Sequence, residues 1–192
     1  MNRLLLWLFA LTQAFTLARG SGEQIELRDP EGRVVSPLRE SDVRASVFIF
    51  TRTDCPISNR YAPELRRLYS KFAGRRIAFW LVYPGHKVSP AGIQAHLKEY
   101  AYPLPALQDP DHRLVKLTGV RVTPEVAVFA GSGAKAHLVY HGRIDDRFED
   151  FGKSRPTATR HELEDVLQAI LDGSPIATSE APAVGCFIAD LE

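Results

Sequence analysis

The sequence predicts a three-layer α/β domain built around a central mixed sheet. Two continuous apolar runs, 46–51 and 77–83, have the composition of strands that are buried on both faces. A helical pattern follows each run, with apolar residues recurring every three or four positions. A third strand at 126–129 is followed by a glycine-rich turn and a return strand at 136–140, which indicates an antiparallel hairpin.

The remaining elements complete this order. Residues 21–41 predict an N-terminal hairpin with turn residues at its centre, and Ser89-Pro90 predicts the start of the second helix. We expect an irregular link around residues 103–107, a short helix at 112–117, and a polar loop at 148–156. Thr159 and Glu162 have capping-box spacing, so they predict the start of a last helix that Gly173 ends.

Length and charge restrict the function. The chain has 192 residues and a formal net charge of +1, from 24 basic and 23 acidic side chains. This length suits one domain with short additions. Nucleic acid is not expected as a partner, because phosphate binding needs a clustered basic surplus. Two cysteines are too few for a disulfide scaffold, so each must be considered individually.

The first residues predict an export signal. Arg3 precedes an apolar run over 4–11, and the small residues Thr16 and Ala18 suit cleavage after residue 18. An uncleaved membrane anchor is the alternative, but the run is short of the roughly 20 residues that span a bilayer. We therefore expect a signal peptide over 1–18, a domain over 22–173, and a flexible linker with a cysteine-containing tail over 174–192. The expected location is outside the cytoplasm, in a bacterial periplasm, with no membrane insertion after cleavage.

Cys55 is the first candidate for chemistry. It lies between a buried strand and a helix start, where free amide groups and the helix dipole lower the pKa of a thiol below about 8.5. Arg52 and Arg60 flank it and add positive potential, while Asp54 opposes them. An inert buried cysteine is the alternative, but such a residue seldom lies between an aspartate and a proline at an element boundary.

Thr123-Pro124 is the second signal. Proline lacks a backbone donor and is awkward at the start of a core strand. A cis bond here would turn the chain sharply and present the backbone of Thr123 to whatever lies beside Cys55. A trans proline at the first position of the strand is the other interpretation.

Together these segments resemble the exported redoxin branch of the thioredoxin-like superfamily, related to the alkyl hydroperoxide reductase/thiol-specific antioxidant family. The segments that carry the resemblance read FTRTDCPISNRYAPEL, FWLVYP, GVRVTPEVAVF and HGRIDDR. The resemblance covers roughly residues 22–173 and implies a thioredoxin-like fold. It further implies a nucleophilic thiol at Cys55 and a cis-proline at Pro124 beside which a substrate docks.

The chain departs from the family patterns at the site. In two-cysteine thioredoxins the partner thiol lies three residues after the first, and here that position is Ser58. A Cys-x-x-Ser site attacks a disulfide but does not resolve the mixed disulfide locally. Peroxiredoxins place proline and threonine seven and three residues before the reactive cysteine, where this chain has Phe48 and Arg52. Asp54 replaces a common tryptophan and is expected to raise the pKa of the thiol.

Cys186 is the other thiol, beyond the expected linker. It is predicted to swing onto the active-site face and act as the resolving cysteine. The alternatives are a static disulfide with Cys55, an unpaired thiol, or a metal ligand. A Cys55–Cys186 crosslink would close a long loop and stabilise the fold by about 4–5 kcal/mol.

The sequence therefore predicts catalytic roles for Cys55, Cys186 and Pro124. Substrate binding is predicted for Thr123, Arg52, Ser58 and Arg121. Arg121 is included because it is near Pro124, where it would steady a thiolate or an anionic substrate. His86 with the two thiols would make a Cys₂His set for copper(I) or zinc, although a solvated loop histidine is the simpler interpretation. We expect no metal and no cofactor, because phosphate-loop, Gly-x-Gly-x-x-Gly and His-Glu-x-x-His motifs are absent.

The sequence thus predicts a thiol–disulfide oxidoreductase. Its partners would be a protein substrate with a disulfide or thiol and an upstream reductant. The alternatives are a peroxiredoxin-like peroxide reductase that uses the same two cysteines, and a non-enzymatic copper or haem-assembly partner.

Overall fold

A computed structural model describes residues 25–189 of the chain, so the expected signal peptide lies outside the described residues. Its main sheet has eight strands in the order β11-β8-β7-β3-β4-β5-β1-β2. Their bounds are β1 Leu27–Arg28, β2 Val34–Val35, β3 Ala45–Phe50, β4 Ile77–Pro84, β5 Ala106–Asp109, β7 Glu125–Ala130, β8 His137–Gly142 and β11 Glu180–Ala181. Strands β3, β4 and β5 are parallel neighbours, while β7 runs antiparallel to both β3 and β8. The predicted central mixed sheet is confirmed.

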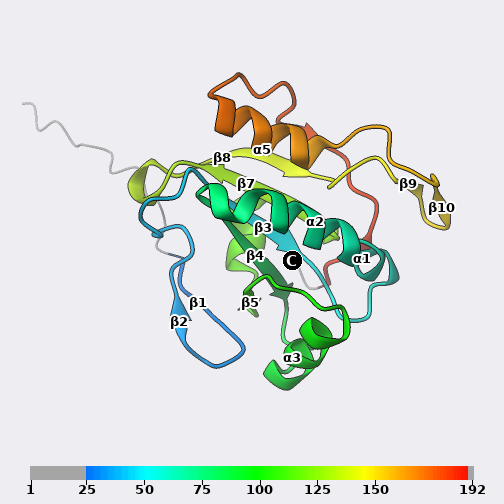
Figure 1. Cartoon of the computed structure of the whole chain (residues 1–192). Helices are drawn as coiled ribbons and strands as arrows, with labels where there is room; N and C mark the ends of the chain where they lie inside the picture. Colours follow the sequence, from blue (N-terminus) through cyan, green and yellow to red (C-terminus); the bar gives the residue numbers. More distant parts are fainter. Residues whose placement is uncertain (1–24, 190–192) are drawn as a thin grey trace, which may run out of the picture.

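Helices cover both faces of this sheet. Their bounds are α1 Pro56–Arg60, α2 Ala62–Phe72, α3 Pro90–Glu99, α4 Arg113–Thr118 and α5 Glu162–Asp172, with short 3₁₀ turns at Ala73–Arg75 and Gly133–Lys135. Figure 1 shows α2 and α5 over the same face of the sheet. Two further pairs of short strands lie outside it: β6 Val122–Thr123 with β12 Cys186–Phe187, and β9 Phe148–Asp150 with β10 Lys153–Ser154.

Alternation along β3 builds the two sides of the core. All six residues of β3 are buried. Val47 and Ile49 belong to the apolar cluster that includes Leu65 of α2. Phe48 and its neighbours on the opposite face belong to a second cluster with Leu114 of α4. Successive side chains of a strand point to opposite faces, so a strand between two helical layers is apolar throughout.

The helical stretch after Cys55 is divided in two. The helix α1 ends at Arg60, and α2 begins at Ala62 with Pro63 in its first turn. A proline inside a continuous helix would remove one backbone hydrogen bond and clash with the carbonyl four residues earlier. The break places Pro63 in the first turn of α2. Backbone N–H groups of a first turn have no intrahelical acceptor, so the proline removes no hydrogen bond there.

Three local expectations were wrong. The expected link at 103–107 contains the start of β5, which pairs in parallel with β4. The expected polar loop at 148–156 contains the β9–β10 pair. The hydroxyl of Thr159 donates to Asp146 at 2.6 Å instead of capping α5, whose N-cap is His161.

The segment after α5 follows the sheet edge, although the sequence predicts a flexible linker there. Strand β11 pairs in parallel with β8, and β12 pairs antiparallel with β6. The red segment in Figure 1 runs from the edge of the sheet beside β8 toward α1. These pairings bring the end of the described chain to the N-terminal end of α1.

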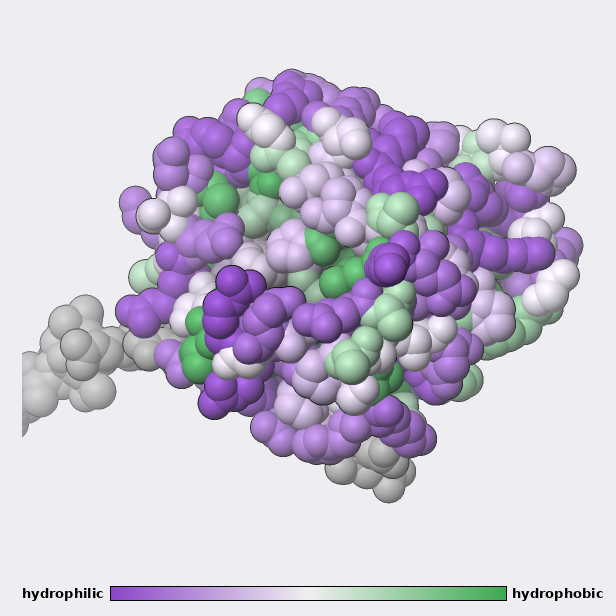
Figure 2. Space-filling view, turned by 60° about the horizontal axis from the view of Figure 1, so that its bottom comes forward, coloured by the Kyte–Doolittle hydropathy of each residue, from purple (hydrophilic) through white to green (hydrophobic). Residues whose placement is uncertain are grey.

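Among residues 25–189, the longest helices are too short or too polar to cross a membrane. On the face seen in Figure 2, hydrophobic surface lies in small separate areas among hydrophilic side chains. Scattered apolar areas of this kind are ordinary on a surface that contacts water.

Candidate active site

Cys55 is the N-cap residue of α1 and is fully buried, with 0% of its surface exposed. The buried strand β3 ends at Phe50, and a short loop over 51–54 carries the chain to the helix start. Pro56 occupies the first position of the helix. A backbone N–H at this position has no intrahelical acceptor, so proline costs the helix no hydrogen bond there. The junction predicted from the sequence is therefore present, and the thiol lies at its centre.

The tail brings the second thiol to the first. Cys186 is paired with Thr123 in the register of β12 and β6. Its Sγ lies 2.6 Å from the Sγ of Cys55, and both cysteines are free thiols in this structure. Bonded sulfurs are about 2.05 Å apart, so oxidation by an outside disulfide would need only a small movement to join the pair.

The two thiols differ in acidity. Burial raises the pKa of the Cys55 thiol, but hydrogen bonds from Cys186 and Ser58 outweigh that effect and leave the pKa below its usual value. Burial and the hydrogen bond to Cys55 raise the pKa of Cys186 to about 12. The shared proton therefore belongs on Cys186, and Cys55 is the sulfur that ionises.

Ser58 supports this difference from the third position after Cys55. Its side chain is buried, and its hydroxyl has no hydrogen-bond partner of ordinary geometry among the described residues. A hydroxyl that is free to donate to the sulfur of Cys55 favours the thiolate and lowers the pKa of that thiol. A serine at this position therefore acts on the reactive sulfur, although it does not replace a resolving thiol.

The peptide bond between Thr123 and Pro124 is cis. The carbonyl oxygen of Thr123 lies 3.0 Å from the sulfur of Cys55, a contact that suits the protonated thiol as donor. The hydroxyl of Thr123 donates to the carbonyl of Cys186 at 3.4 Å. The fully buried Thr123 thus contacts both cysteines.

Glu125 holds the backbone that precedes this proline. Its carboxylate accepts hydrogen bonds from the amides of Arg121 at 2.8 Å and Val122 at 3.2 Å. Sequence reasoning missed this role. A buried charged residue at the start of an apolar strand was the available signal, since a buried carboxylate needs donors.

Arg52 connects the active-site loop to the tail. Its guanidinium forms a two-point ion pair with Asp54 at 3.0 and 2.7 Å and donates to the carbonyl of Phe187 at 3.1 Å. The hydrogen bond with Arg52 outweighs burial and lowers the pKa of Asp54. Arg52 thus balances the charge of Asp54 beside Cys55, and the expected effect of Asp54 on the pKa of that thiol stays a prediction.

Arg121 takes part through its backbone. Its carbonyl accepts a hydrogen bond from the amide of Ile188 at 3.0 Å. Its side chain is exposed and makes no hydrogen bond or ion pair with another described residue. Its predicted action on a thiolate or an anion therefore has no contact to support it.

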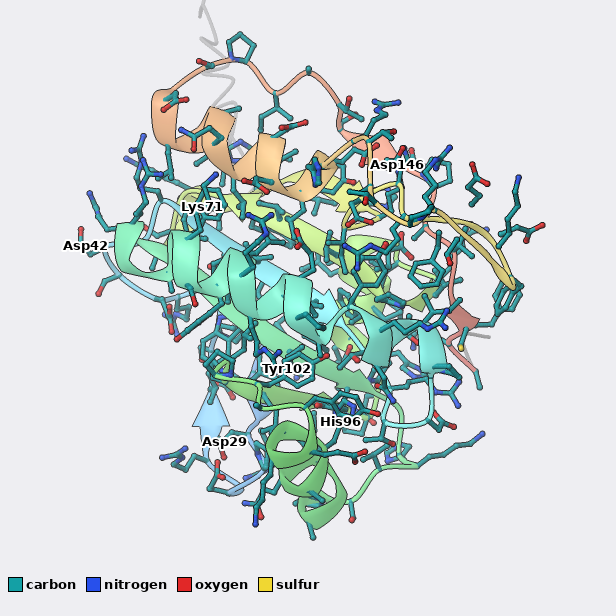
Figure 3. All side chains as sticks on the ribbon, turned by 45° about the vertical axis from the view of Figure 1, so that its right-hand side comes forward. Asp29, Asp42, Lys71, His96, Tyr102 and Asp146 are labelled. Carbon is teal, nitrogen blue, oxygen red and sulfur yellow. The ribbon has the colours of Figure 1, made fainter. Side chains whose placement is uncertain are left out.

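A chain of hydrogen bonds ties the active-site loop to the core. The Asn59 amide donates to the carbonyl of Thr53 at 3.1 Å, and its oxygen lies 2.9 Å from Nε2 of His96. The other ring nitrogen of His96 lies 2.8 Å from the hydroxyl of Tyr83. Burial lowers the pKa of His96, so the neutral ring donates to Asn59 and accepts from Tyr83. Figure 3 labels His96 on α3, on the side of that helix toward the sheet.

The Cys₂His set considered for copper(I) or zinc does not form among the described residues. The cluster of metal-ligand side chains found there consists of Glu64, Asp145 and His161 and includes neither thiol. The side chain of His86 is 77% exposed, and its nearest acidic group, Asp111, lies 3.9 Å away.

A mixed sheet of this order, a thiol at the first helix start and a cis-proline beside it define a thioredoxin-like redoxin. The sequence profile described as the AhpC/TSA family matches residues 11–142, which is more than half of the chain. The chain belongs to the AhpC/TSA family. The resemblance inferred from its motifs is confirmed.

Solved structures show the same fold. A hypothetical protein from Sinorhizobium meliloti 1021 is 23% identical with a TM-score of 0.71, over 85% of this chain and 89% of that one. An uncharacterized conserved protein from Geobacillus kaustophilus is 25% identical with a TM-score of 0.70, over 85% and 87%. A secreted Mycobacterium tuberculosis disulfide oxidoreductase homologous to E. coli DsbE is 17% identical with a TM-score of 0.52, over 78% and 96%. No curated protein sequence matches the chain significantly.

Proposed function

We propose that this redoxin is a thiol–disulfide oxidoreductase in which Cys55 is the nucleophile and Cys186 the resolving thiol. The observation that carries the proposal is the approach of the two sulfurs to 2.6 Å with opposite shifts in their pKa values. A thiolate attacks a disulfide and a thiol does not, so the lower pKa of Cys55 assigns the first attack to it.

The reaction balances with the two thiols of the chain. The Cys55 thiolate attacks one sulfur of a partner disulfide, and the other partner sulfur leaves as a thiolate. Cys186 then loses its proton, attacks the Cys55 sulfur of the mixed disulfide and releases the second partner sulfur. The partner gains two electrons, and the chain keeps a Cys55–Cys186 disulfide that an upstream reductant with a thiol reopens.

Access to Cys55 requires the tail to move. Cys55 has no exposed surface, and Cys186 covers it from β12. A partner reaches the thiolate when β12 separates from β6, and the return of β12 delivers the resolving thiol. Residues 1–18 support the further proposal that this exchange takes place in the periplasm.

Trapping tests the proposal. In the Cys186→Ser variant the mixed disulfide has no resolving thiol, so we expect adducts between Cys55 and disulfide-bearing proteins to accumulate on non-reducing gels. The matched variant Cys55→Ser keeps the tail thiol and is expected to trap far less. Equal trapping by the two variants, or none by either, would contradict the assignment of Cys55 as nucleophile.

Membership of the AhpC/TSA family favours one alternative, a peroxide reductase with Cys55 oxidised to sulfenic acid and resolved by Cys186. The same pair of sulfurs would serve either reaction. Hydrogen peroxide consumption by the reduced protein separates them, since a rate no greater than that of a free thiol excludes the peroxidase.

A further inference from the structure

The tail occupies the active site as an added strand. The amide of Ile188 donates to the carbonyl of Arg121 at 3.0 Å, and Cys186 pairs with Thr123. Arg52 donates to the carbonyl of Phe187 at 3.1 Å. These contacts use the backbone of the tail, so they would hold another extended segment equally well.

Gly185 lies where the tail comes closest to the cis-proline. A Cβ at this position would meet the Thr123 carbonyl oxygen at 2.3 Å, its carbon at 2.6 Å and the nitrogen of Pro124 at 3.1 Å. All three are backbone atoms of a buried segment and have little freedom to move. The backbone of Gly185 has no positive φ. Space alone therefore requires a glycine immediately before the cysteine.

The two positions after the cysteine differ. The side chain of Phe187 points into solvent, with 74% of its surface exposed. Ile188 is 6% exposed and belongs to the apolar cluster of Val115 and Val120, around α4. The site therefore selects an apolar side chain at the second position after the cysteine. It does not select the side chain at the first position after the cysteine.

We infer that the β6 edge recognises partner segments of the pattern glycine, cysteine, any residue, aliphatic residue, and that the tail is a built-in competitor with this pattern. The inference rests on the proposed function, because it describes the segment that presents the disulfide to Cys55. A partner that matches the pattern displaces β12 and places its own cysteine sulfur where Cys186 now lies. The partner is accordingly a protein with an extended Gly-Cys-x-aliphatic segment at its surface.

Synthetic peptides test this selection on the full chain carrying Cys186→Ser. The reference peptide has the sequence Ala-Val-Gly-Cys-Phe-Ile-Ala, with thionitrobenzoate disulfide-bonded to its cysteine. Attack by the Cys55 thiolate on the peptide sulfur forms a Cys55–peptide disulfide and releases thionitrobenzoate, which is followed by absorbance. Mass spectrometry of the protein then identifies the adduct.

We expect the peptide with alanine in place of glycine to react about tenfold to a hundredfold more slowly, because overpacking against fixed backbone is costly. A peptide with serine in place of isoleucine should also react more slowly. The matched control has alanine in place of phenylalanine and should react at the same rate as the reference.

The small reagent 5,5′-dithiobis(2-nitrobenzoate) separates the two ways of failing. If it modifies Cys55 while the glycine and alanine peptides react alike, the inferred selection is wrong and the proposed function stands. If neither the reagent nor any peptide modifies Cys55, the proposed function fails and the inference fails with it.

Within the chain, Gly185→Ala gives a second measurement. The reduced protein is mixed with oxidised glutathione, which accepts the two electrons and leaves as two glutathione thiols. The change should hinder docking of β12 and slow formation of the Cys55–Cys186 disulfide by about tenfold or more. Gly74→Ala is the matched control, since a Cβ there meets no atom within 4 Å and its φ is not positive. Equal rates of oxidation in the two variants would overturn the role of Gly185.

Discussion

At the scale of single residues, the site depends on how the proton is shared between two sulfurs. Cys55 was identifiable from the sequence because an aspartate and a proline frame it at an element boundary. The role of Ser58 was not identifiable from the sequence. The sequence shows that a serine stands where a second thiol is common, but it does not show where the hydroxyl of that serine points. The structure buries Ser58 one helical turn after Cys55 and gives its hydroxyl no hydrogen-bond partner of ordinary geometry among the described residues.

We predict that Ser58→Ala raises the pKa of Cys55, because the thiolate loses a hydrogen-bond donor. Iodoacetamide labelling of Cys55 in the reduced protein, followed by mass spectrometry across pH, measures the change. The rate near neutral pH should fall by about tenfold, and the profile should move toward higher pH. Ser70→Ala, on the exposed face of α2, is the control. An unchanged profile in the first variant would show that Ser58 does not act on the sulfur.

At the scale of elements, α3 supports the active-site loop through His96 and Asn59. The two ring nitrogens of His96 join Tyr83 of β4 to Asn59 of α1, and Asn59 holds the carbonyl of Thr53. The sequence predicted each of these elements but not the connection. Asn59 and His96 are 37 positions apart, and only the packing of α3 beside α1 brings them into contact.

His96 also predicts a pH dependence. Burial lowers its pKa in the folded state, so the unfolded chain binds more protons as the pH falls below about 6.5. Its contribution to stability is complete above that pH and is lost as the pH falls toward the pKa of the folded state. His96→Gln should cost about 1–3 kcal/mol near neutral pH, because buried hydrogen bonds are lost.

Urea unfolding of that variant at about pH 7.5 and about pH 5.5 tests the sign. The variant should lose less stability between the two conditions than the natural chain does. His137→Gln changes an exposed histidine of β8 and serves as the control. An acid-induced loss in His96→Gln equal to that of the natural chain would contradict the assignment.

The missed elements share a physical cause. Strand β5 is only four residues long, and it lies directly between Pro105 and Pro110, which are signals of irregular structure. Strands β11 and β12 have two residues each, in a segment rich in proline, alanine and serine. Their pairing depends on close backbone approach at Gly142 and Gly185, where a Cβ would meet backbone atoms. Such contacts between distant segments leave no periodic pattern to detect.

At the scale of the whole molecule, the central sheet was predictable from the sequence. The pairing of the tail with β8 and β6 was not predictable. Continuous apolar runs identified β3, β4 and β7, which form its middle. The tail crosses from β8 to β6 and so connects the last helix to the first. The cysteines that meet there are 131 positions apart, so oxidation would enclose most of the fold in one loop.

The loop length predicts a large effect of oxidation on stability. In the chain-entropy account, a crosslink over such a loop stabilises the folded state by about 4–5 kcal/mol. Guanidinium unfolding of the natural chain with and without reductant should show this difference. The Cys186→Ser variant should show none, because it cannot form the bond. A natural chain equally stable in both conditions would mean that the disulfide does not form or that it strains the fold.

The pairing of β11 with β8 sets how far the resolving sulfur can travel. The carbonyl of Ala181 accepts from the amide of Arg143 at 3.0 Å, and four residues separate Ala181 from Cys186. A fully stretched tether of that length reaches about 17 Å. While β11 stays in place, Cys186 thus remains at millimolar or higher effective concentration around Cys55. Mixed disulfides of the natural chain should therefore be short-lived intermediates.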